Sequence, residues 1–307
     1  MACRILLILN PSAAAGRAPK RWDGLRSELA RREVQVDHAL SQAPGHATQL
    51  ALAGCDRYEV IAAVGGDGTV NEVTNGIMSA PGPRRCLAIV PFGTGNDAAH
   101  HTGIHTQEDA VAALAGDQCR PTDVIEVAHG GPGAEQVSHS LLFAAVGFAG
   151  ELIKRTTPLV KRILGPRFCY SAGFLRAWAS YRCRPMRVTT DTAEFSGRFF
   201  HVCAGNSEYG GGGVMRMSPG AKMDDGRLEL CVIEGLSRLE ILRCFPRLLR
   251  GTHITHPRVR YFPGRTLRVE SWPDQELQLD GDLIGRTPAT FTVLPSALCI
   301  LVPPKIR

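Results

Sequence analysis

Residues 63–76, AVGGDGTVNEVTNG, take an apolar run directly into Gly-Gly-Asp-Gly-Thr and then continue with a helix-like pattern. Gly65 and Gly66 permit a tight turn, and Gly68 lets the backbone approach a ligand without a Cβ in the way. We expect Thr69 to cap the helix that follows, so that the first amides of this helix point at the turn. Such a turn is suited to bind an anion.

Asp67 lies between these glycines and carries the wrong charge for an anion site. A carboxylate repels a bound anion unless a cation lies between them, as Mg²⁺ does when it is bound to nucleotide phosphates. The alternative is a plain strand-to-helix turn in which Asp67 is a local cap. The turn by itself does not decide between these two interpretations.

A second glycine-rich turn follows the next apolar run, in residues 88–100, AIVPFGTGNDAAH. Pro91 ends the predicted strand, and a helix is expected to follow the turn. The stretch also fits the dinucleotide pattern G-x-G-x-x-A. This match is weak, because the first strand-helix unit lacks the pattern and no ribose-binding acid is placed for it. The polar and glycine residues of the turn are Gly93, Thr94, Gly95, Asn96 and Asp97.

Both turns belong to a region of alternating strand and helix patterns. Apolar runs at 4–10, 58–64 and 84–90 predict strands, and amphipathic patterns at 18–33 and 69–80 predict helices. Short units of this kind in series predict a parallel sheet with helices on both faces. Ligands in such sheets bind at the carboxyl ends of the strands, where both glycine-rich turns lie.

From about residue 124 the sequence changes to short strand patterns bounded by Gly, Pro, Asp and Ser, with helical insertions at roughly 150–182 and 237–250. Such a series favours an antiparallel sandwich or barrel. We therefore expect a two-domain fold with an interdomain cleft. The α/β domain comprises residues 1–128, a β-rich sandwich-like domain comprises 129–295, and 296–307 return to the first domain.

The composition is that of a globular protein. Of 307 residues, 44% are hydrophobic and 21% are charged. The longest apolar runs are shorter than a membrane span. The N-terminal apolar stretch runs into Asn10-Pro11, which favours a first strand over a signal peptide. The ten cysteines are more than four residues apart, so we expect buried free thiols rather than disulfides or a zinc site.

The charge is concentrated in one segment. Residues 152–187 contain nine Lys and Arg and no acidic residue. The formal net charge of this segment is therefore +9, and because the whole chain has +6, the rest of the chain sums to −3. Its apolar residues recur at roughly helical spacing, as in helices that lie on anionic membrane surfaces. The alternative is a helix with a buried apolar face and a solvated basic face. No nucleic-acid-binding motif accompanies the segment, so we expect no nucleic-acid partner.

Taken together, the two turns resemble the diacylglycerol kinase catalytic-domain family, which includes sphingosine and ceramide kinases and bacterial lipid kinases. Its GGDGT followed by N-E, and its P-x-G-T-x-N-D, are present here nearly unaltered. Further similar segments follow in the family's order. They are LILNPSAAAG, TDVIEV, CAGNSEYGGGGVMRMSPGAKMDDGRLEL and QLDGDLIGRTP.

The resemblance implies a lipid kinase that uses ATP and Mg²⁺ to phosphorylate a hydroxyl of diacylglycerol, ceramide or a sphingoid base. Asp67, Asp97 and Asp123 would form an acidic group that organises the nucleotide and its metal. A separate structural Mg²⁺ would bind the Asp225 side chain and main-chain oxygens of Lys222 and Arg227. The implied nucleotide-binding residues are Ser41, Gly65, Gly66, Asp67, Gly68, Thr69, Asn71, Thr94, Gly95 and Asn96.

The family's catalytic base is the Glu of D-G-E, and here that residue is Asp282. Aspartate keeps the charge of glutamate but is one methylene shorter, and small displacements are costly in phosphoryl transfer. The site is slightly more closed, or the base lies elsewhere, for example at Asp67, or the enzyme is weakened. A further alternative is that LDGD is an ordinary hairpin turn.

Two rival functions remain at this stage. An NAD kinase shares the GGDGT turn and a β-rich second domain, but the G-T-G-N-D and D-G-D segments match the lipid kinases better. The second rival is a catalytically weak or silent lipid- or nucleotide-binding protein, which the replacement at Asp282 suggests. The first strand and the scattered cysteines indicate a cytoplasmic protein, and a lipid substrate favours peripheral association with membrane through residues 152–187. Bacterial members of the family are often homodimers, and the sequence leaves the oligomeric state open.

Overall fold

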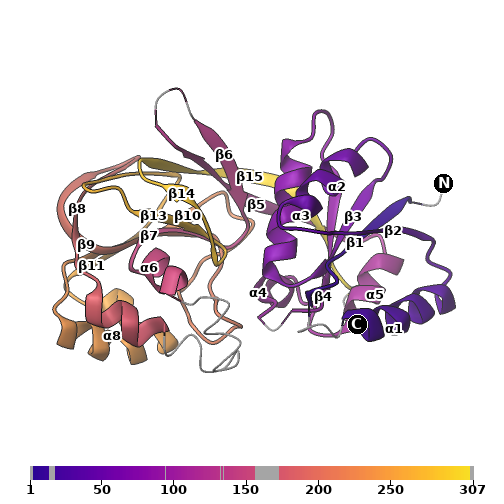
Figure 1. Ribbon diagram of the computed structural model, residues 1–307, viewed down its shortest axis with the longest axis horizontal. Helices are drawn as coiled ribbons and strands as arrows, with labels where there is room; N and C mark the ends of the chain where they lie inside the picture. Colours follow the sequence, from indigo (N-terminus) through magenta and orange to yellow (C-terminus); the bar gives the residue numbers. More distant parts are fainter. Residues whose placement is uncertain are drawn as a thin grey trace. The chain divides into compact units, whose positions relative to one another are not determined.

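The computed structural model describes residues 3–13, 18–93, 95–131, 133, 135–155 and 173–304. The chain forms two compact units (Figure 1). Unit 1 comprises Met1–Val124, Gly211–Gly213 and Leu294–Arg307, and unit 2 comprises Ile125–Gly210 and Val214–Val293. The fold class predicted from the sequence, an α/β N-terminal region followed by a β-rich region, is confirmed. None of the described helices is long and apolar enough to cross a membrane.

Unit 1 is built on a parallel sheet with the strand order β15-β4-β3-β1-β2. Every residue of β1 and β3 is buried, which accounts for their uninterrupted apolar sequences. The strands are β1 (Ile5–Leu9), β2 (Val36–Leu40), β3 (Val60–Gly65), β4 (Cys86–Pro91) and β15 (Ala289–Leu301).

The helices of unit 1 pack in two groups on the sheet, α2 with α3 and α1 with α5 (Figure 1). Gly76 of α3 allows the first contact, because a Cβ there would lie only 2.6 Å from the Cβ of Ala51 in α2. The helices are α1 (Ala18–Arg31), α2 (His46–Gly54), α3 (Asp67–Ser79), α4 (Asp97–His101) and α5 (Gln107–Ala115).

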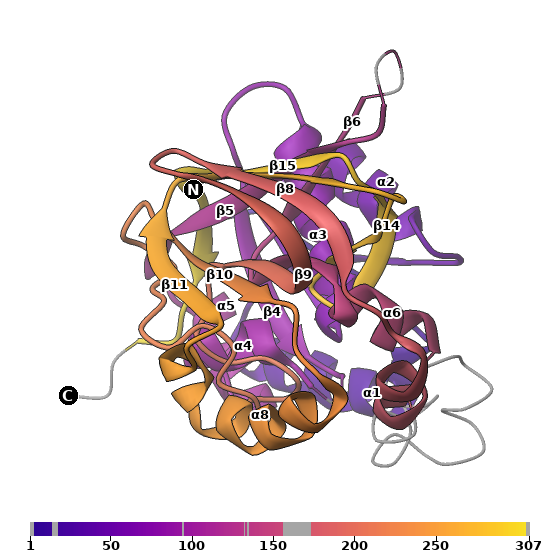
Figure 2. The same ribbon diagram turned by 90° about the vertical axis from the view of Figure 1, so that its left-hand side faces the viewer.

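Unit 2 is antiparallel. Strand β9 (Glu194–Gly205) organises it, because its first half pairs with β8 (Arg184–Thr190) and its second half lies between β7 (Phe143–Gly147) and β10 (Leu228–Glu234). Figure 2 shows β9 with β8 and β10. A core of alternating residues fills the interior, among them Val146, Val202 and Leu230. The remaining strands are β6 (Gln136–Ser140), β11 (Val259–Gly264), β12 (Thr266–Ser271), β13 (Glu276–Leu279) and β14 (Asp282–Arg286).

Three helices of unit 2 share a small apolar cluster. Phe148 opens α6 (Phe148–Arg155), Ala177 lies in the helical residues 173–180, and Ile241 lies in α8 (Arg238–Arg250). Phe148 stacks on Phe200 with ring centroids 4.7 Å apart. Helix α8 begins with a capping box between Ser237 and Glu240 and is followed by the short 3-10 helix η2 (Thr252–Thr255).

Strands β5 (Cys119–His129) and β15 carry the chain out of unit 1 and back into it. They pair with each other, and a disulfide joins Cys119 of β5 to Cys299 of β15, with the Cα atoms 5.8 Å apart. The expectation that the chain has no disulfide is therefore wrong. The two residues are 180 positions apart, and only the return of β15 into the sheet of unit 1 brings them together.

Candidate functional site

The two glycine-rich turns of unit 1 touch each other. They follow the adjacent parallel strands β3 and β4, and the amides of Phe92 and Gly93 donate to the Gly65 carbonyl at 2.7 and 3.1 Å. A Cβ on Gly93 would lie 2.5 Å from the Cα of Gly66. The two turns can approach this closely only because both positions are glycine. They therefore present bare backbone side by side at the carboxyl edge of the sheet.

The first turn is held by Thr69 and the first strand. A Cβ on Gly65 would lie 2.5 Å from the Cβ of Thr69, so the strand-to-helix bend also depends on glycine. The expectation that Thr69 caps the helix is wrong, because α3 already begins at Asp67, with Gly66 as N-cap and no side-chain cap. Thr69 is buried inside the first turn, and its hydroxyl accepts a hydrogen bond from Asn10 Nδ2 at 3.1 Å.

The second turn is closed by its own asparagine. Asn96 adopts the left-handed conformation, with φ 56°, which asparagine tolerates better than most residues. Its Oδ1 accepts from the Gly93 amide at 2.9 Å, and its Nδ2 donates to the Gly93 carbonyl at 3.0 Å. Arg21 of α1 supports the same turn, because its guanidinium donates to the Pro91 carbonyl at 2.9 Å and lies 4.3 Å from the Phe92 ring centre.

Two carboxylates of unit 1 approach Gly95. A Cβ on this residue would lie 2.9 Å from Asp67 Oδ2 and 3.9 Å from Asp97 Oδ2. Asp67 Oδ1 accepts from the Ala98 amide at 3.3 Å. Asp97 is buried, and its two oxygens accept from the amides of Gly213 and Gly212 at 2.7 and 3.0 Å. Carboxylate oxygens of both aspartates therefore border the space that a Cβ on Gly95 would occupy.

The other predicted residues of unit 1 have structural contacts. Asp123 is fully buried, and its Oδ1 accepts from the Ser296 amide of β15 at 2.7 Å. The buried Ser41 follows β2, and its amide donates to the Leu9 carbonyl at 2.9 Å. Asn71 lies in α3 and accepts from Asn75 Nδ2 at 3.2 Å. Thr94 lies outside the described residues.

The acidic group does not form a compact metal cluster by itself. Where the structure describes the chain, the only group of three or more His, Cys, Asp or Glu residues with ligand atoms all within 4.8 Å is Cys86, Cys119 and Cys299. Asp67, Asp97 and Asp123 do not meet this criterion. Oxygen ligands for a cation at Gly95 would therefore have to include some from a bound phosphate or from water.

In unit 2, the two aspartates of LDGD have different surroundings. Asp280 has φ 46° and lies in the turn between β13 and β14. Its Oδ1 accepts from the Ser140 hydroxyl and from the amides of Leu142 and Phe143 at 2.7, 3.0 and 2.8 Å. Its Oδ2 accepts from the Leu141 amide at 2.9 Å. Asp282, the predicted base, is the first residue of β14 and is exposed.

The predicted structural metal site is an exposed turn before β10. Asp225 Oδ1 accepts from the Arg227 amide at 3.0 Å, and Gly226 has φ 70°. Lys222, Asp225 and Arg227 are all exposed. Burial, and then the nearby Asp225 carboxylate, raise the pKa of Glu229. The carboxylate and carbonyl oxygens of this turn are of the type that Mg²⁺ prefers.

The described part of segment 152–187 is less basic in effect than its sequence suggests. Lys154 is paired with Glu276 at 2.9 Å, Arg155 with Glu151 at 2.6 Å and Arg187 with Glu194 at 3.6 Å. Exposed apolar side chains lie at Leu175 within this segment and on α8. Residues 156–172, which carry three of the nine basic residues, lie outside the described residues.

Two family models match the chain in succession. Residues 4–127 match the diacylglycerol kinase catalytic domain, and residues 153–302 match the YegS C-terminal NAD kinase beta sandwich-like domain. The chain belongs to the diacylglycerol kinase catalytic-domain family. A relative in this family from Staphylococcus haemolyticus (strain JCSC1435), named diacylglycerol kinase, is 28% identical over 306 residues, which cover 98% of this chain and 88% of the relative.

Solved structures share the two-part fold of this diacylglycerol kinase family member. A candidate diacylglycerol kinase from Bacillus anthracis str. Sterne superposes with a TM-score of 0.81 at 24% identity, over 99% of this chain and 96% of that chain. Yeast NADH kinase complexed with NADH superposes with a TM-score of 0.52 at 11% identity, over 98% and 83% of the two chains. At these identities the similarity concerns the fold.

Sequence reasoning missed several residues that shape this site in the family member. Glu72, of the N-E pair, accepts from the Ala47 amide at 3.0 Å and so caps α2. Asn10 directly follows β1 and Arg21 lies in α1, and no pattern near the glycines predicts their contacts with the two turns. Gly212 and Gly213 belong to a glycine run that the resemblance includes, but their contact with Asp97 depends on the chain re-entering unit 1.

Proposed function

We propose that the chain is a lipid kinase that transfers the γ-phosphate of ATP, with Mg²⁺, to a hydroxyl of a membrane lipid. Diacylglycerol, ceramide and a sphingoid base are the candidate acceptors. The kinase class is supported by relatives named diacylglycerol kinase. The proposal rests mainly on the contact between the two glycine-rich turns, which lies beside the Asp67 and Asp97 carboxylates. A triphosphate needs close backbone approach, and its counter-cation needs carboxylate oxygens.

The residues at Gly95 fit a phosphate-bound Mg²⁺. The position that a Cβ would fill is bordered by Asp67 Oδ2 and Asp97 Oδ2, which are hard oxygen donors. Mg²⁺ usually keeps water and phosphate ligands in addition to one or two carboxylates, so a site with few protein ligands suits it. When bound, the metal would neutralise negative charge on the phosphates. The turn at Asp225 offers the same donor chemistry for a structural ion.

The chain's own residues have three tasks in the proposed reaction. The bare backbone at Gly66 and Gly93 receives the phosphates without steric conflict. Asp67 holds the counter-cation, and Asp280 fixes the hairpin that carries Asp282. We propose Asp282 as the base, which accepts the proton of the lipid hydroxyl as its oxygen attacks the γ-phosphorus in line.

The test uses purified full-length protein, ATP labelled at the γ-phosphate, Mg²⁺ and lipids extracted from membranes. The expected result is label in an organic-extractable lipid whose headgroup mass spectrometry identifies, with no label transfer when EDTA removes the metal. Asp282→Asn should reduce turnover by about 10²- to 10⁴-fold, the usual contribution of a general base. Label that appears in NADP after addition of NAD, and not in lipid, would instead establish the small-molecule kinase.

The same assay separates a catalytic protein from a silent one. If wild-type protein binds ATP without turnover and Asp282→Glu restores strong turnover, the natural protein is a binding protein with a shortened base. If both proteins turn over, the site accommodates the shorter side chain. Light scattering of the purified protein tests the homodimer, which stays a prediction.

A membrane-docking face for the lipid substrate is supported by α8 in unit 2. Leu239, Leu242 and Leu249 are 56%, 39% and 39% exposed, and Phe245 is 37% exposed. These residues recur at intervals of three and four and therefore share one side of the helix. Ile241 faces the apolar cluster of unit 2 on the other side. The α8 face, defined by these four exposed residues, is apolar. Its Phe245 also packs against Phe174 of the apolar cluster, with ring centroids 4.8 Å apart, so the three leucines are the part of the face that lies outside this cluster.

The charges around the α8 face favour an anionic membrane surface. Four exposed arginines lie on the helix with one acidic residue, Glu240, which is engaged in the capping box. Apolar residues flanked by arginine suit a helix lying in the headgroup region of anionic lipids. Leu175, in the helical residues 173–180, adds another exposed apolar side chain to unit 2. The arginines are Arg238, Arg243, Arg247 and Arg250.

Sedimentation with vesicles tests this face. Wild-type protein should bind phosphatidylglycerol vesicles more strongly than phosphatidylcholine vesicles. The double variant Leu242→Ser, Leu249→Ser should lose at least about tenfold in partitioning, because each leucine buries an apolar side chain in the interface. Leu40→Ser, at an exposed leucine of unit 1, is the matched control. Equal binding of all three proteins would exclude α8 as the docking face.

A further inference from the structure

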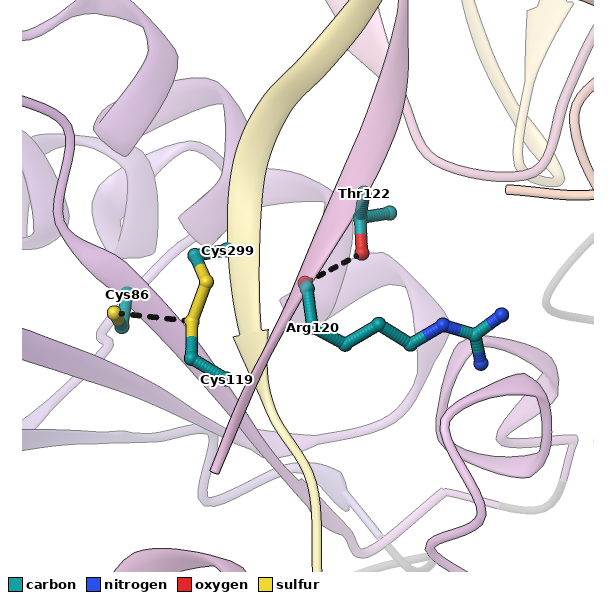
Figure 3. Close-up of a disulfide and its surroundings, with 5 residues drawn as sticks. All are labelled: Cys86, Cys119, Arg120, Thr122 and Cys299. Carbon is teal, nitrogen blue, oxygen red and sulfur yellow. Dashed lines mark hydrogen bonds between the residues drawn. A yellow bond between two sulfur atoms is a disulfide. The ribbon is translucent and has the colours of Figure 1, made fainter. Parts of the chain in front are cut away.

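Three cysteines of unit 1 meet at the edge of the sheet away from the glycine-rich turns. Cys86 is the first residue of β4, Cys119 the first of β5, and Cys299 lies near the end of β15 (Figure 3). Cys299 is the Cα partner of Cys86 in the parallel ladder. Strand β4 continues for five residues to Pro91, so the trio lies about 17 Å along the strand from the second glycine-rich turn.

The trio holds one disulfide and one additional thiol within contact distance. Cys119 is bonded to Cys299, and the sulfur of Cys86 lies 3.6 Å from that of Cys119. The three sulfur atoms all lie within 4.8 Å of one another. All three residues are partly exposed rather than fully buried. A thiol in van der Waals contact with a disulfide is the arrangement from which thiol–disulfide exchange begins.

We propose that Cys86, Cys119 and Cys299 form a thiol–disulfide exchange site, in which Cys86 attacks the Cys119–Cys299 disulfide and a single disulfide is shared among three sulfur atoms. The Cys86 thiolate attacks Cys119 Sγ, the Cys86–Cys119 bond forms, and the Cys119–Cys299 bond breaks. Cys299 leaves as a thiolate and takes up a proton equivalent to the one that Cys86 released. No electron enters or leaves the protein in this step.

The oxidised trio forms from the reduced one at the expense of a low-molecular-weight disulfide. One cysteine thiolate attacks that disulfide and releases one small thiol. A second cysteine then resolves the mixed disulfide and releases the other small thiol. The balance is two cysteine thiols and one small disulfide converted into one protein disulfide and two small thiols. The site would therefore take small disulfides of the glutathione type as its oxidant.

The exchange changes which strand is covalently tied. The Cys119–Cys299 bond joins β5 to β15, the two strands through which the chain leaves and re-enters unit 1. A Cys86–Cys119 bond would join β5 to β4 instead and leave β15 held by its ladder alone. The site is distinct from the proposed nucleotide site, so its chemistry can be tested without turnover.

Another cysteine pair in the molecule provides an internal control. Cys203 of β9 and Cys231 of β10 are direct Cα partners across an antiparallel ladder, yet both are free and buried. Burial raises the pKa of both thiols, which keeps them protonated. Burial and then the nearby Cys3 also raise the pKa of Cys86. The exchange rate of the trio should therefore increase about tenfold per pH unit below the Cys86 pKa, because the thiolate is the nucleophile.

The experiment maps disulfides in full-length protein equilibrated with oxidised glutathione, quenched with acid, alkylated and digested without reduction. At equilibrium wild-type protein should give both the 119–299 and the 86–119 peptide, and in samples taken before equilibrium the 86–119 peptide should appear faster as the pH is raised toward 9. Cys299→Ser should give the 86–119 peptide in place of 119–299. Cys203 and Cys231 should remain thiols throughout and be alkylated once the quenched protein is denatured, and Cys55→Ser should match the wild type.

The outcomes that would overturn the proposal are equally defined. If Cys299→Ser leaves Cys86 and Cys119 both alkylatable, the disulfide is a fixed structural bond. If wild-type protein, which has no folding defect to consider, gives only the 119–299 peptide at every pH, Cys86 is not an attacking thiol. If the wild type forms no disulfide and binds Zn²⁺ at the trio, the site is a metal centre.

Discussion

Asp280→Asn tests whether the first aspartate of LDGD is structural and the second chemical. The Asp280 carboxylate accepts four hydrogen bonds, three at Oδ1 and one at Oδ2. An asparagine keeps an acceptor oxygen at only one position. If this oxygen occupies the Oδ1 position, the new amide group meets the N–H of Leu141, and two donors face each other.

The cost follows from the number and type of these bonds. A hydrogen bond to a charged group contributes about 1.5–3 kcal/mol, and the substitution removes one and takes the charge from the other three. We expect a loss of about 2–4 kcal/mol in the free energy of unfolding of unit 2. For a domain of this size, each kcal/mol corresponds to about 2–4 °C in Tm. The expected decrease is therefore roughly 4–16 °C.

Thermal unfolding followed by circular dichroism measures this effect, with Asp282→Asn as the matched control. Asp282 is exposed, and its substitution should change stability by no more than about 0.5 kcal/mol while turnover falls. Asp280→Asn should show the opposite pattern at a temperature where it is folded, with a lower Tm and a smaller loss of turnover. Equal Tm values for the two variants would refute the assignment of the hydrogen bonds as the anchor of this hairpin.

Three further predictions concern other parts of the molecule. Gly93→Ala places a Cβ 2.5 Å from the Cα of Gly66, so calorimetry should show loss of ATP binding, whereas Gly24→Ala, with its nearest neighbour atom at 3.8 Å, should bind normally. Burial lowers the pKa of His201 to about 4. The unfolded chain therefore binds a proton between about pH 6.5 and pH 4 that the folded chain does not. His201 should account for about 2 kcal/mol of the stability lost in urea unfolding between pH 7.5 and 5, and His201→Gln should reduce the loss by that amount, whereas the part due to buried histidines such as His253 stays. Cys119→Ser should lower the free energy of unfolding by up to about 5 kcal/mol, because the disulfide closes a loop across a sequence separation of 180. If the effect comes from the covalent bond, a dithiol reductant should lower the free energy of unfolding of the wild type equally.

The fold could be predicted where the sequence has a clear local pattern. The buried strands β1 and β3 are continuous apolar runs, and the glycines after β3 and β4 mark the turns. The short strands β11 and β14 were not predicted, because exposed residues interrupt their apolar pattern. Two of the short strand patterns after residue 124, ATFTV at 289–293 and ALCILVP at 297–303, lie largely in a single strand, β15, in which Ser296 has φ 47°.

Contacts between distant segments could not be predicted in the same way. The pairing of Cys299 with Cys86, and the hydrogen bond from the Ser296 amide to Asp123, depend on the final strand joining the sheet of unit 1. The sequence suggests that the C-terminal residues return, but not which residue lies opposite which. The same limit applies to Asp280, whose donors lie some 140 residues earlier in the chain.

The geometry of unit 1 assigns unequal parts to the three acids that the resemblance groups together. Asp123 is fully buried, and its Oδ1 accepts from the Ser296 amide, which ties it to β15. Both oxygens of Asp97 accept from backbone amides of the 211–213 segment, which stabilises their charge and fixes their position. Asp67 begins α3, and its Oδ2 is the carboxylate oxygen that most closely approaches the side-chain-free position at Gly95. We therefore expect a phosphate-bound cation to depend most on Asp67. Asp97 borders the same position from farther away and also holds the 211–213 backbone, and Asp123 holds β15.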